Sequence, residues 1–145
     1  MTNMDYIGFL IKLIYDEIDR EVNRKLVKHG LTSSQVAVLI FLHTQERAQA
    51  TIKDIQRFLN VSQPTATGLV RRLEKKGFVR VFEDPQDRRV RIVRLTNETS
   101  SVYESIQSLM RETEAMLKQG FSAQERDQVY ALLNRIYQNT QASKG

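Results

Sequence analysis

The spacing of apolar residues along this 145-residue chain changes from segment to segment, and each change predicts a different element. Residues 5–28 carry an apolar side chain about every 3.6 residues, which predicts one amphipathic helix. Residues 33–42 are apolar on nearly every side, so we expect a central, buried helix. Thr32 and Gln35 have the spacing of a capping box at its start. The polar residues 43–50 then predict a turn.

Two shorter helices are predicted next. Thr51 is a suitable N-cap for a helix over residues 52–59, whose apolar positions again have a helical period. A tight connection at residues 60–61 leads to Ser62, a good N-cap for a helix over residues 63–76. The glycine that follows this second helix is a natural place for it to stop.

A period of two residues then replaces the helical period. Residues 78–82 have the composition of a strand, and residues 83–87 have turn chemistry. Residues 89–95 alternate charged and apolar side chains strictly, which predicts a strand with one buried face and one cationic face. The two strands together predict a β-hairpin with a polar, basic tip.

The last third of the chain returns to the helical period. We predict a helix over residues 96–119 and, after a glycine, a second helix that Ser122 and Glu125 start as a capping box. Apolar residues between 129 and 137 share one face of that helix. Residues 138–145 are expected to be a fraying tail.

This order of elements predicts a mainly α protein with a small β-hairpin wing. A short helix, a tight turn, a helix with a polar face and a basic hairpin make a winged helix-turn-helix, here over residues 31–96. Helices in residues 1–30 and 97–145 flank this core within one domain, 1–145. Their apolar stripes are too extensive for the winged core alone to cover, so we expect them to be dimerisation helices.

Charge and composition narrow the function. Residues 51–96 hold 11 Lys and Arg against 5 Asp and Glu, whereas the rest holds 11 against 12, so the whole excess of +5 lies in the middle of the chain. A localised basic patch is typical of a protein that neutralises phosphates. The absence of cysteine excludes disulfides, thiolate metal sites and a catalytic thiol.

The predicted helix over residues 63–76 has the features of a DNA-reading helix. Its apolar stripe leaves a face of small hydroxyls and an amide at the N-terminal end, which can approach base edges in a major groove. Arg71 and Arg72 can reach phosphates or guanine edges. An ordinary surface helix with solvated arginines is the alternative, which the basic hairpin that follows makes less attractive.

The segments SQPTAT (62–67), LEKKG (73–77), DP (84–85), DRR (87–89) and LT (95–96) resemble the multiple antibiotic resistance regulator (MarR) family over nearly the whole chain. The resemblance implies a homodimer whose first and last helices interleave, with the two winged cores on successive major grooves of duplex DNA. It implies that an arginine of the wing enters the minor groove and that Asp87 holds this arginine in place. The candidate DNA-binding residues are Ser62, Gln63, Pro64, Thr65, Thr67, Arg71, Arg72, Arg88 and Arg89.

The resulting hypothesis is a sequence-specific, duplex-DNA-binding transcription regulator that acts in the cytoplasm as a homodimer. An inverted-repeat operator, repression and release by a small-molecule effector are expected. A winged-helix module for protein–protein contact without DNA readout is the alternative, although the cationic strand is unlike the charge-depleted centre of such interfaces. RNA is disfavoured, because its deep major groove does not admit a reading helix.

Other classes of site find little support in the residues. The chain has no glycine-rich phosphate loop, nucleophile elbow or metal-ligand cluster, so we predict no enzyme, cofactor or metal site, and no apolar run is long enough to span a membrane. His29 and His43 stand alone in the sequence. Tyr6, Tyr15 and Tyr103 can line an effector pocket, or they can belong to a dimer core.

Overall fold

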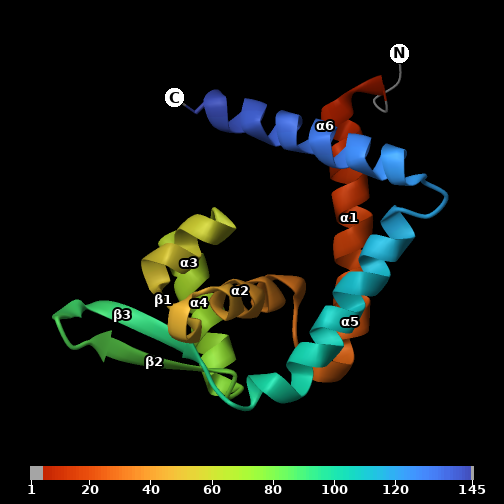
Figure 1. The fold of residues 1–145 in the computed structure, drawn as a ribbon. Coiled ribbons are helices and arrows are strands. Elements are labelled where there is room, and N and C mark those ends of the chain that lie inside the picture. Colours follow the sequence, from red (N-terminus) through yellow and green to blue (C-terminus); the bar gives the residue numbers. More distant parts are fainter. Residues whose placement is uncertain (1–4, 145) are drawn as a thin grey trace. The chain divides into compact units, whose positions relative to one another are not determined.

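The computed structural model describes residues 5–144 (Figure 1). The chain is mainly helical, with one small antiparallel sheet, as the sequence predicts. It divides into two compact units, Met1–Leu109 and Met110–Gly145. The elements are α1 (Ile7–Leu26), the 3₁₀ turn η2 (Val27–His29), α2 (Ser33–Thr44), the 3₁₀ turn η3 (Glu46–Ala48), β1 (Gln49–Thr51), α3 (Ile52–Leu59), α4 (Gln63–Lys75), β2 (Val79–Asp84), β3 (Asp87–Leu95), α5 (Thr99–Leu117) and α6 (Ala123–Ala142).

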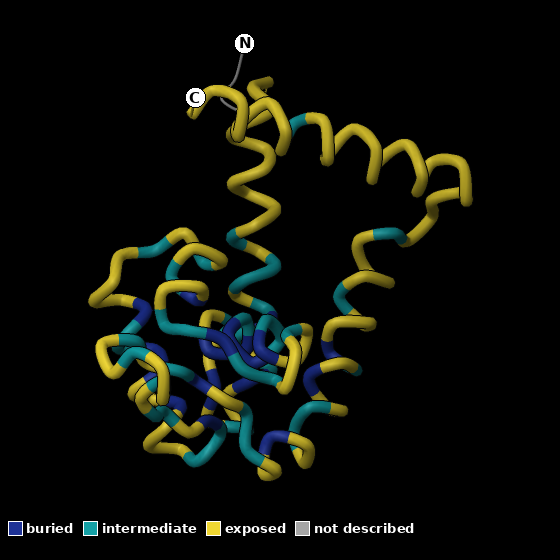
Figure 2. Tube along the Cα trace, turned by 60° about the vertical axis from the view of Figure 1, so that its left-hand side comes forward, coloured by how far each residue is buried: buried dark blue, intermediate teal, exposed yellow. Residues whose placement is uncertain are grey.

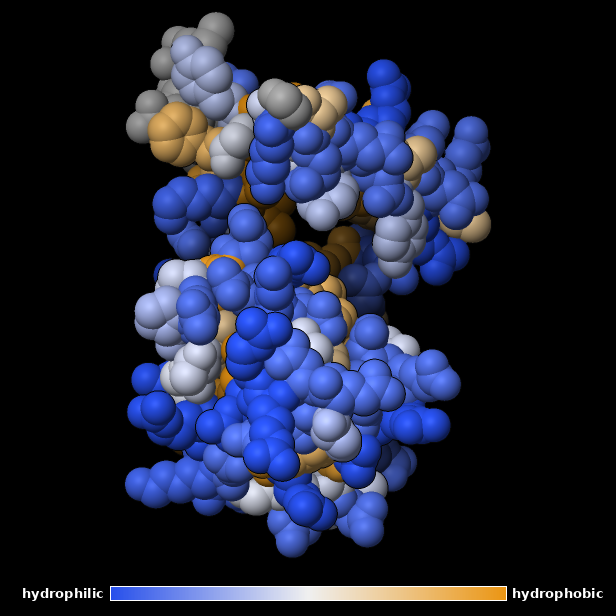
Figure 3. Space-filling view, turned by 90° about the vertical axis from the view of Figure 1, so that its left-hand side faces the viewer, coloured by the Kyte–Doolittle hydropathy of each residue, from blue (hydrophilic) through white to orange (hydrophobic). Residues whose placement is uncertain are grey.

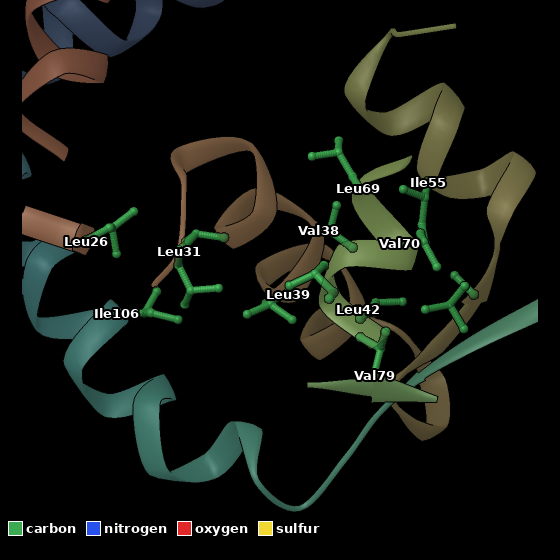
Figure 4. Close-up of a cluster of buried hydrophobic side chains, with 14 of the residues drawn as sticks. Leu26, Leu31, Val38, Leu39, Leu42, Ile55, Leu69, Val70, Val79 and Ile106 are labelled. Atoms are coloured by element: carbon green, nitrogen blue, oxygen red, sulfur yellow. The ribbon is translucent and has the colours of Figure 1, made fainter. Parts of the chain in front are cut away.

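The hydrophobic core of the first unit is built around α2 (Figure 4). Val38, Leu39 and Leu42 of this helix are fully buried, which confirms the central helix that its all-round apolar pattern predicts. Side chains from seven other elements complete this cluster, including Leu26, Ala50, Ile55, Leu73, Val79, Val93 and Ile106. In Figure 2 the buried residues are concentrated in this winged core.

The helix starts follow the predicted caps. Thr32 and Gln35 form both halves of the capping box of α2. Thr51 accepts a hydrogen bond from the N–H of Asp54 at the start of α3, and Ser62 accepts one from the N–H of Thr65 at the start of α4. These contacts confirm that short local patterns determine where the helices begin.

The polar sequence of residues 43–50 predicts a turn, but the structure forms more than a turn there. Gln49–Thr51 forms the strand β1, which pairs antiparallel with β3 and gives the strand order β1-β3-β2. Ala50 faces Val93 in this register and is buried with it. Three residues are too few to show a period of two, so only the tertiary pairing reveals this strand.

Three other boundaries also differ from the prediction. The strands of the hairpin extend into the predicted turn, which leaves only residues 85–86 between β2 and β3. Helix α5 begins at Thr99 rather than Thr96, because Thr96 donates from its hydroxyl to Gly77 O at 2.6 Å. The predicted fraying tail is wrong at its start, since α6 continues to Ala142; residue 145 lies outside the described residues.

The two ends of α1 differ in environment. Val22 and Leu26 near its C-terminus are buried in the core, whereas the apolar side chains of its first half are exposed (Figure 2). The left-handed Gly30, with φ of 67°, ends the η2 turn that follows. Apolar residues are therefore left without cover along the first half of α1.

Polar contacts at the surface join the helices of the second unit. The hydroxyl of Tyr130 on α6 donates to Glu114 Oε2 on α5 at 2.8 Å, and Lys118 Nζ lies 3.0 Å from the same oxygen. Between residues 123 and 142 no side chain is buried, and Leu132, Leu133 and Tyr137 are each more than half exposed. Helices α5 and α6 are thus joined by a polar contact among Tyr130, Glu114 and Lys118, here called the polar clasp. The apolar face of α6 is left exposed.

Candidate DNA interface

Burial of one stripe fixes the orientation of α4. Ala66, Leu69, Val70 and Leu73 are all buried, as the helical spacing predicts, and they anchor the helix on the core. The left-handed Asn60 makes the sharp connection from α3, so that α4 begins directly after Ser62. The opposite side of α4 therefore points outward.

The outward face of α4 carries the residues that the sequence proposes for base reading. Six of the predicted DNA-binding residues are exposed on this face or at its N-cap, and Thr67 is half-buried. The Ser62 hydroxyl donates to Thr65 Oγ1 at 2.9 Å, which joins two of them at the helix start. The exposed six are Ser62, Gln63, Pro64, Thr65, Arg71 and Arg72.

An open groove connects α4 with the wing. Gln63, Thr67 and Arg71 line it from α4, and Arg89 and Arg91 line it from β3. The structure thus brings four predicted residues to one groove, namely Gln63, Thr67, Arg71 and Arg89, whereas Ser62, Pro64, Thr65, Arg72 and Arg88 are not part of its lining. Figure 3 looks onto the wing side of the molecule and shows a predominantly hydrophilic surface there.

At the tip of the wing, Asp87 holds Arg89. Arg89 donates from Nε to Asp87 Oδ1 at 3.1 Å and from Nη2 to Oδ2 at 3.3 Å, and its backbone N–H also donates to Oδ1 at 3.1 Å. The side-chain hydrogen bonds from Arg89, followed by the backbone one, lower the pKa of Asp87 below its ordinary value. The guanidinium is pre-oriented yet almost wholly exposed, at 92%, so a ligand can reach it.

Comparison with known proteins identifies a family with this arrangement of elements. Residues 31–90 match the family model described as "MarR family". The "Uncharacterized HTH-type transcriptional regulator YwoH" of Bacillus subtilis (strain 168) is 36% identical over 110 residues, which are 76% of this chain and 78% of that protein.

The chain belongs to the MarR family.

Solved structures agree with this assignment. The chain is similar to S. aureus MepR in a DNA complex, with a TM-score of 0.86 and 27% identity over 92% of this chain and 98% of that one. It is also similar to a mutant MarR of E. coli complexed with operator DNA, with a TM-score of 0.80 and 26% identity over 90% of this chain and 92% of that one. Both similarities extend well beyond the matched segment 31–90, into the flanking helices.

Two basic residues of this MarR-family protein line the groove but are not among the predicted site residues. Arg91 lies on the cationic face of β3, so the alternation of the strand could have identified it. Lys53 comes from α3, and nothing in its local sequence separates it from any solvated lysine. Only the packing of α3 beside α4 places Lys53 at the groove.

The other arginines of the wing have different surroundings. Arg94 donates from Nε to Gln49 Oε1 at 2.8 Å and lies 4.9 Å above the ring of Phe82, so it braces the three strands. Arg88 is exposed beside the tip. Of the two tip arginines, the one with an orienting partner is therefore Arg89.

The predicted tyrosines and histidines lie apart from the groove lining. Tyr103 on α5 stacks on His43 of α2, with ring centroids 4.0 Å apart. Tyr6 meets Phe9 edge-on, and Tyr15 is exposed on α1. Among residues 5–144 no group of three or more His, Asp or Glu side chains is placed to hold a metal ion.

Proposed function

We propose that this MarR-family protein binds duplex DNA sequence-specifically through the outward face of α4, its N-cap and the wing. The residues proposed to contact DNA are Ser62, Gln63, Pro64, Thr65, Thr67, Arg71, Arg72, Arg88 and Arg89. The observation that carries the proposal is the shared groove, in which a face of amides and hydroxyls adjoins a pre-oriented, exposed arginine. Small polar groups on a helix suit base edges in the major groove. An arginine held at the tip of a hairpin suits a narrow minor groove, where the negative potential is enhanced.

The proposal includes a homodimer. Helices α1 and α6 each leave a row of large apolar side chains exposed, and monomeric proteins rarely leave such rows open to water. Sedimentation at micromolar concentration should give a species of twice 16.9 kDa. A two-fold dimer implies a DNA site that is an inverted repeat, with half-sites about one helical turn apart. At the N-cap and in the first half of α1 the exposed apolar residues are Tyr6, Ile7, Phe9, Leu10, Ile11, Leu13, Ile14 and Tyr15.

We further propose that residues 1–145 work as one winged-helix domain, with residues 31–96 as the DNA-binding core and residues 1–30 and 97–145 as dimerisation helices. Its expected effect is repression, because an occupied site excludes other proteins from the same duplex. The proposed role requires no catalysis, and it places the protein in the cytoplasm with the chromosome. Within residues 5–144, no helix has the length and apolarity to cross a membrane.

Release by a small-molecule effector is the remaining part of the proposal. The stacked pair His43 and Tyr103 supports it, because two flat, partly accessible rings offer a surface on which an aromatic compound can stack. Screening aromatic compounds for release of labelled DNA tests this part. A Tyr103→Ala variant that still binds DNA but no longer responds is the expected result.

The deciding experiment is selection of bound sequences from a random duplex library. We expect an inverted repeat, and we expect Gln63→Ala or Thr65→Ala to relax the preference at individual base pairs by about 1–3 kcal/mol while leaving the salt dependence unchanged. Binding of single-stranded DNA and RNA of the same sequence serves as the control. A library without enrichment would favour the alternative, a winged-helix module for protein–protein contact.

A further inference from the structure

The C-terminal end of α4 is tied to a distant part of the chain by Lys76. This residue follows α4, and its ammonium donates to Gly30 O and, at 3.0 Å, to Gln35 Oε1. The two acceptors lie 46 and 41 residues earlier in the sequence, in the joint between α1 and α2. Hydrogen bonds from a charged donor are stronger than those between neutral groups. The contact is therefore a specific brace between the reading helix and this joint.

The acceptors of Lys76 are themselves fixed. Gln35 is buried at 3% exposure, and its Oε1 also accepts the backbone N–H of Thr32 at 3.2 Å as half of the capping box of α2. Gly30 is held in the left-handed conformation, with its N–H donating to Val27 O at 2.9 Å. One amide oxygen thus serves both the start of α2 and the end of α4.

The same joint is anchored to α1. Asn23 Oδ1 accepts the backbone N–H of Ser33 at 2.8 Å, and Asp19 Oδ1 accepts the Ser33 hydroxyl at 2.5 Å. Polar contacts therefore run without interruption from α1, through the first residues of α2, to the end of α4. Because networks of this kind have defined geometry, they fix the direction of the elements that they join.

We infer that Lys76 is a positioning residue for DNA recognition, which sets the direction of α4 relative to the joint from which α1 departs. Helix α4 has 13 residues and is about 20 Å long. A small rotation at its C-terminal end therefore displaces Gln63 and Thr65 at the other end. This inference rests on the proposed DNA-binding function, and it assigns Lys76 no contact with DNA.

Lys75 provides a matched control. It is the preceding residue, it carries the same charge, and its side chain makes no hydrogen bond or ion pair within residues 5–144. The experiment compares Lys76→Met with Lys75→Met in the full-length protein. Affinities for a selected duplex and a scrambled duplex are measured at several salt concentrations, below the melting temperature of each variant. Lys76→Gln, which keeps a donor for Gly30 O but has no charge, is included in case the methionine variant folds poorly.

The expected result is that Lys76→Met lowers the ratio of specific to scrambled affinity about tenfold and leaves the salt slope unchanged. Lys76→Gln should give a smaller loss, and Lys75→Met should keep the ratio. A purely stabilising role would lower the melting temperature but leave this ratio intact. Loss of a phosphate contact would weaken both duplexes alike and make the salt slope shallower. Either of those two results would overturn the inference.

Hydrogen exchange separates this inference from the proposed function, because it needs no DNA. In Lys76→Met the amides of residues 30–36 and 70–77, which lie next to the deleted contact, should exchange several-fold faster than in the wild type, while those of α6 are unaffected. Unchanged exchange at both segments would overturn the inference about Lys76 even if DNA binding is established. A wild-type protein that binds no duplex would instead overturn the proposed function, with the brace judged by exchange alone.

Discussion

Helices α4 and α6 are capped in the same way at the N-terminus, but α4 is partly buried and α6 is not. Ser62 starts α4 and Ser122 starts α6, each by accepting the backbone N–H three residues later. Yet α4 has four buried residues in 13, whereas α6 has none in 20. A cap decides where a helix begins, but burial depends on whether a partner surface is available. For α4 the same chain supplies that surface, and for α6 we propose that a second copy does.

The largest expected effect tests the uncovered face of α6. Leu133→Asp places a charge in the proposed dimer interface, so sedimentation should show a monomer. DNA affinity should fall by about 10²–10⁴-fold, because two linked half-site contacts become one. Gln128→Asp, at an exposed polar position of the same helix, should remain dimeric and bind normally. A Leu133→Asp protein that stays dimeric would show that this face is not the interface.

The next largest effect tests the buried core of the first unit. Leu42 is fully buried at the centre of the winged core, and Leu42→Ala should lower the free energy of unfolding by about 2–5 kcal/mol. Urea unfolding should show this loss at every protein concentration. For Leu133→Ala, in contrast, the loss should depend on concentration, because the partner is another molecule. If the loss of stability depended on protein concentration equally in Leu42→Ala and Leu133→Ala, the two regions would not differ in the source of their partner surface.

A smaller effect separates DNA contact from assembly. Arg89→Ala deletes the arginine that Asp87 orients, so the salt slope should become shallower by up to about 0.9 for each phosphate-region charge lost, and affinity should fall with it. The variant should still sediment as the wild type does. Arg135→Ala, at an exposed position of α6 away from its apolar stripe, is the charge-matched control and should change neither quantity. An unchanged affinity and slope for Arg89→Ala would mean that the wing does not contact DNA.

Gly68→Ala should separate stability from recognition within α4. A glycine inside a helix costs about 0.5–1 kcal/mol relative to alanine, and the added methyl group would meet only the guanidinium of Arg72, whose nearest atom is Nη1 at 3.6 Å. The melting temperature should therefore rise by about 2–4 °C per kcal/mol. DNA affinity should fall, because the methyl group projects from the proposed reading face. Unchanged affinity would place Gly68 outside the area of close contact.

The smallest effect concerns the polar clasp of the second unit. The hydrogen bond from Tyr130, and after it that from Lys118, lowers the pKa of Glu114 below its ordinary value of 4.5. The clasp therefore stabilises the folded state above that pH, and its contribution is lost as the pH falls through the lowered pKa. Tyr130→Phe should cost about 0.5 kcal/mol near pH 7, since solvent screens the contact. In thermal melts this difference should shrink as the pH falls through the lowered pKa of Glu114, and a difference that does not change with pH would contradict the assignment.

Much of the fold follows from local signals. The capping boxes at Thr32 and Ser122 and the buried stripe of α4 are all confirmed. The sequence does not predict the strand β1, because three residues have no detectable period and this strand exists only by pairing with β3. The true start of α5 is also hidden, since it depends on the bond from Thr96 to Gly77 O, 19 residues away.

The candidate site divides in the same way. The sequence alone determined the polar face of α4, the basic wing and a link from Asp87 to a wing arginine, because each depends on neighbours within a few residues, while the structure selected Arg89 over Arg88. The tertiary structure alone decided that Lys53 joins the groove and that Lys76 braces the joint between α1 and α2. Adjacent lysines look alike in a sequence, since charge and length are the same. What distinguishes Lys76 from Lys75 is the direction in which the end of α4 points each side chain, and that direction is set by packing across more than forty residues of chain.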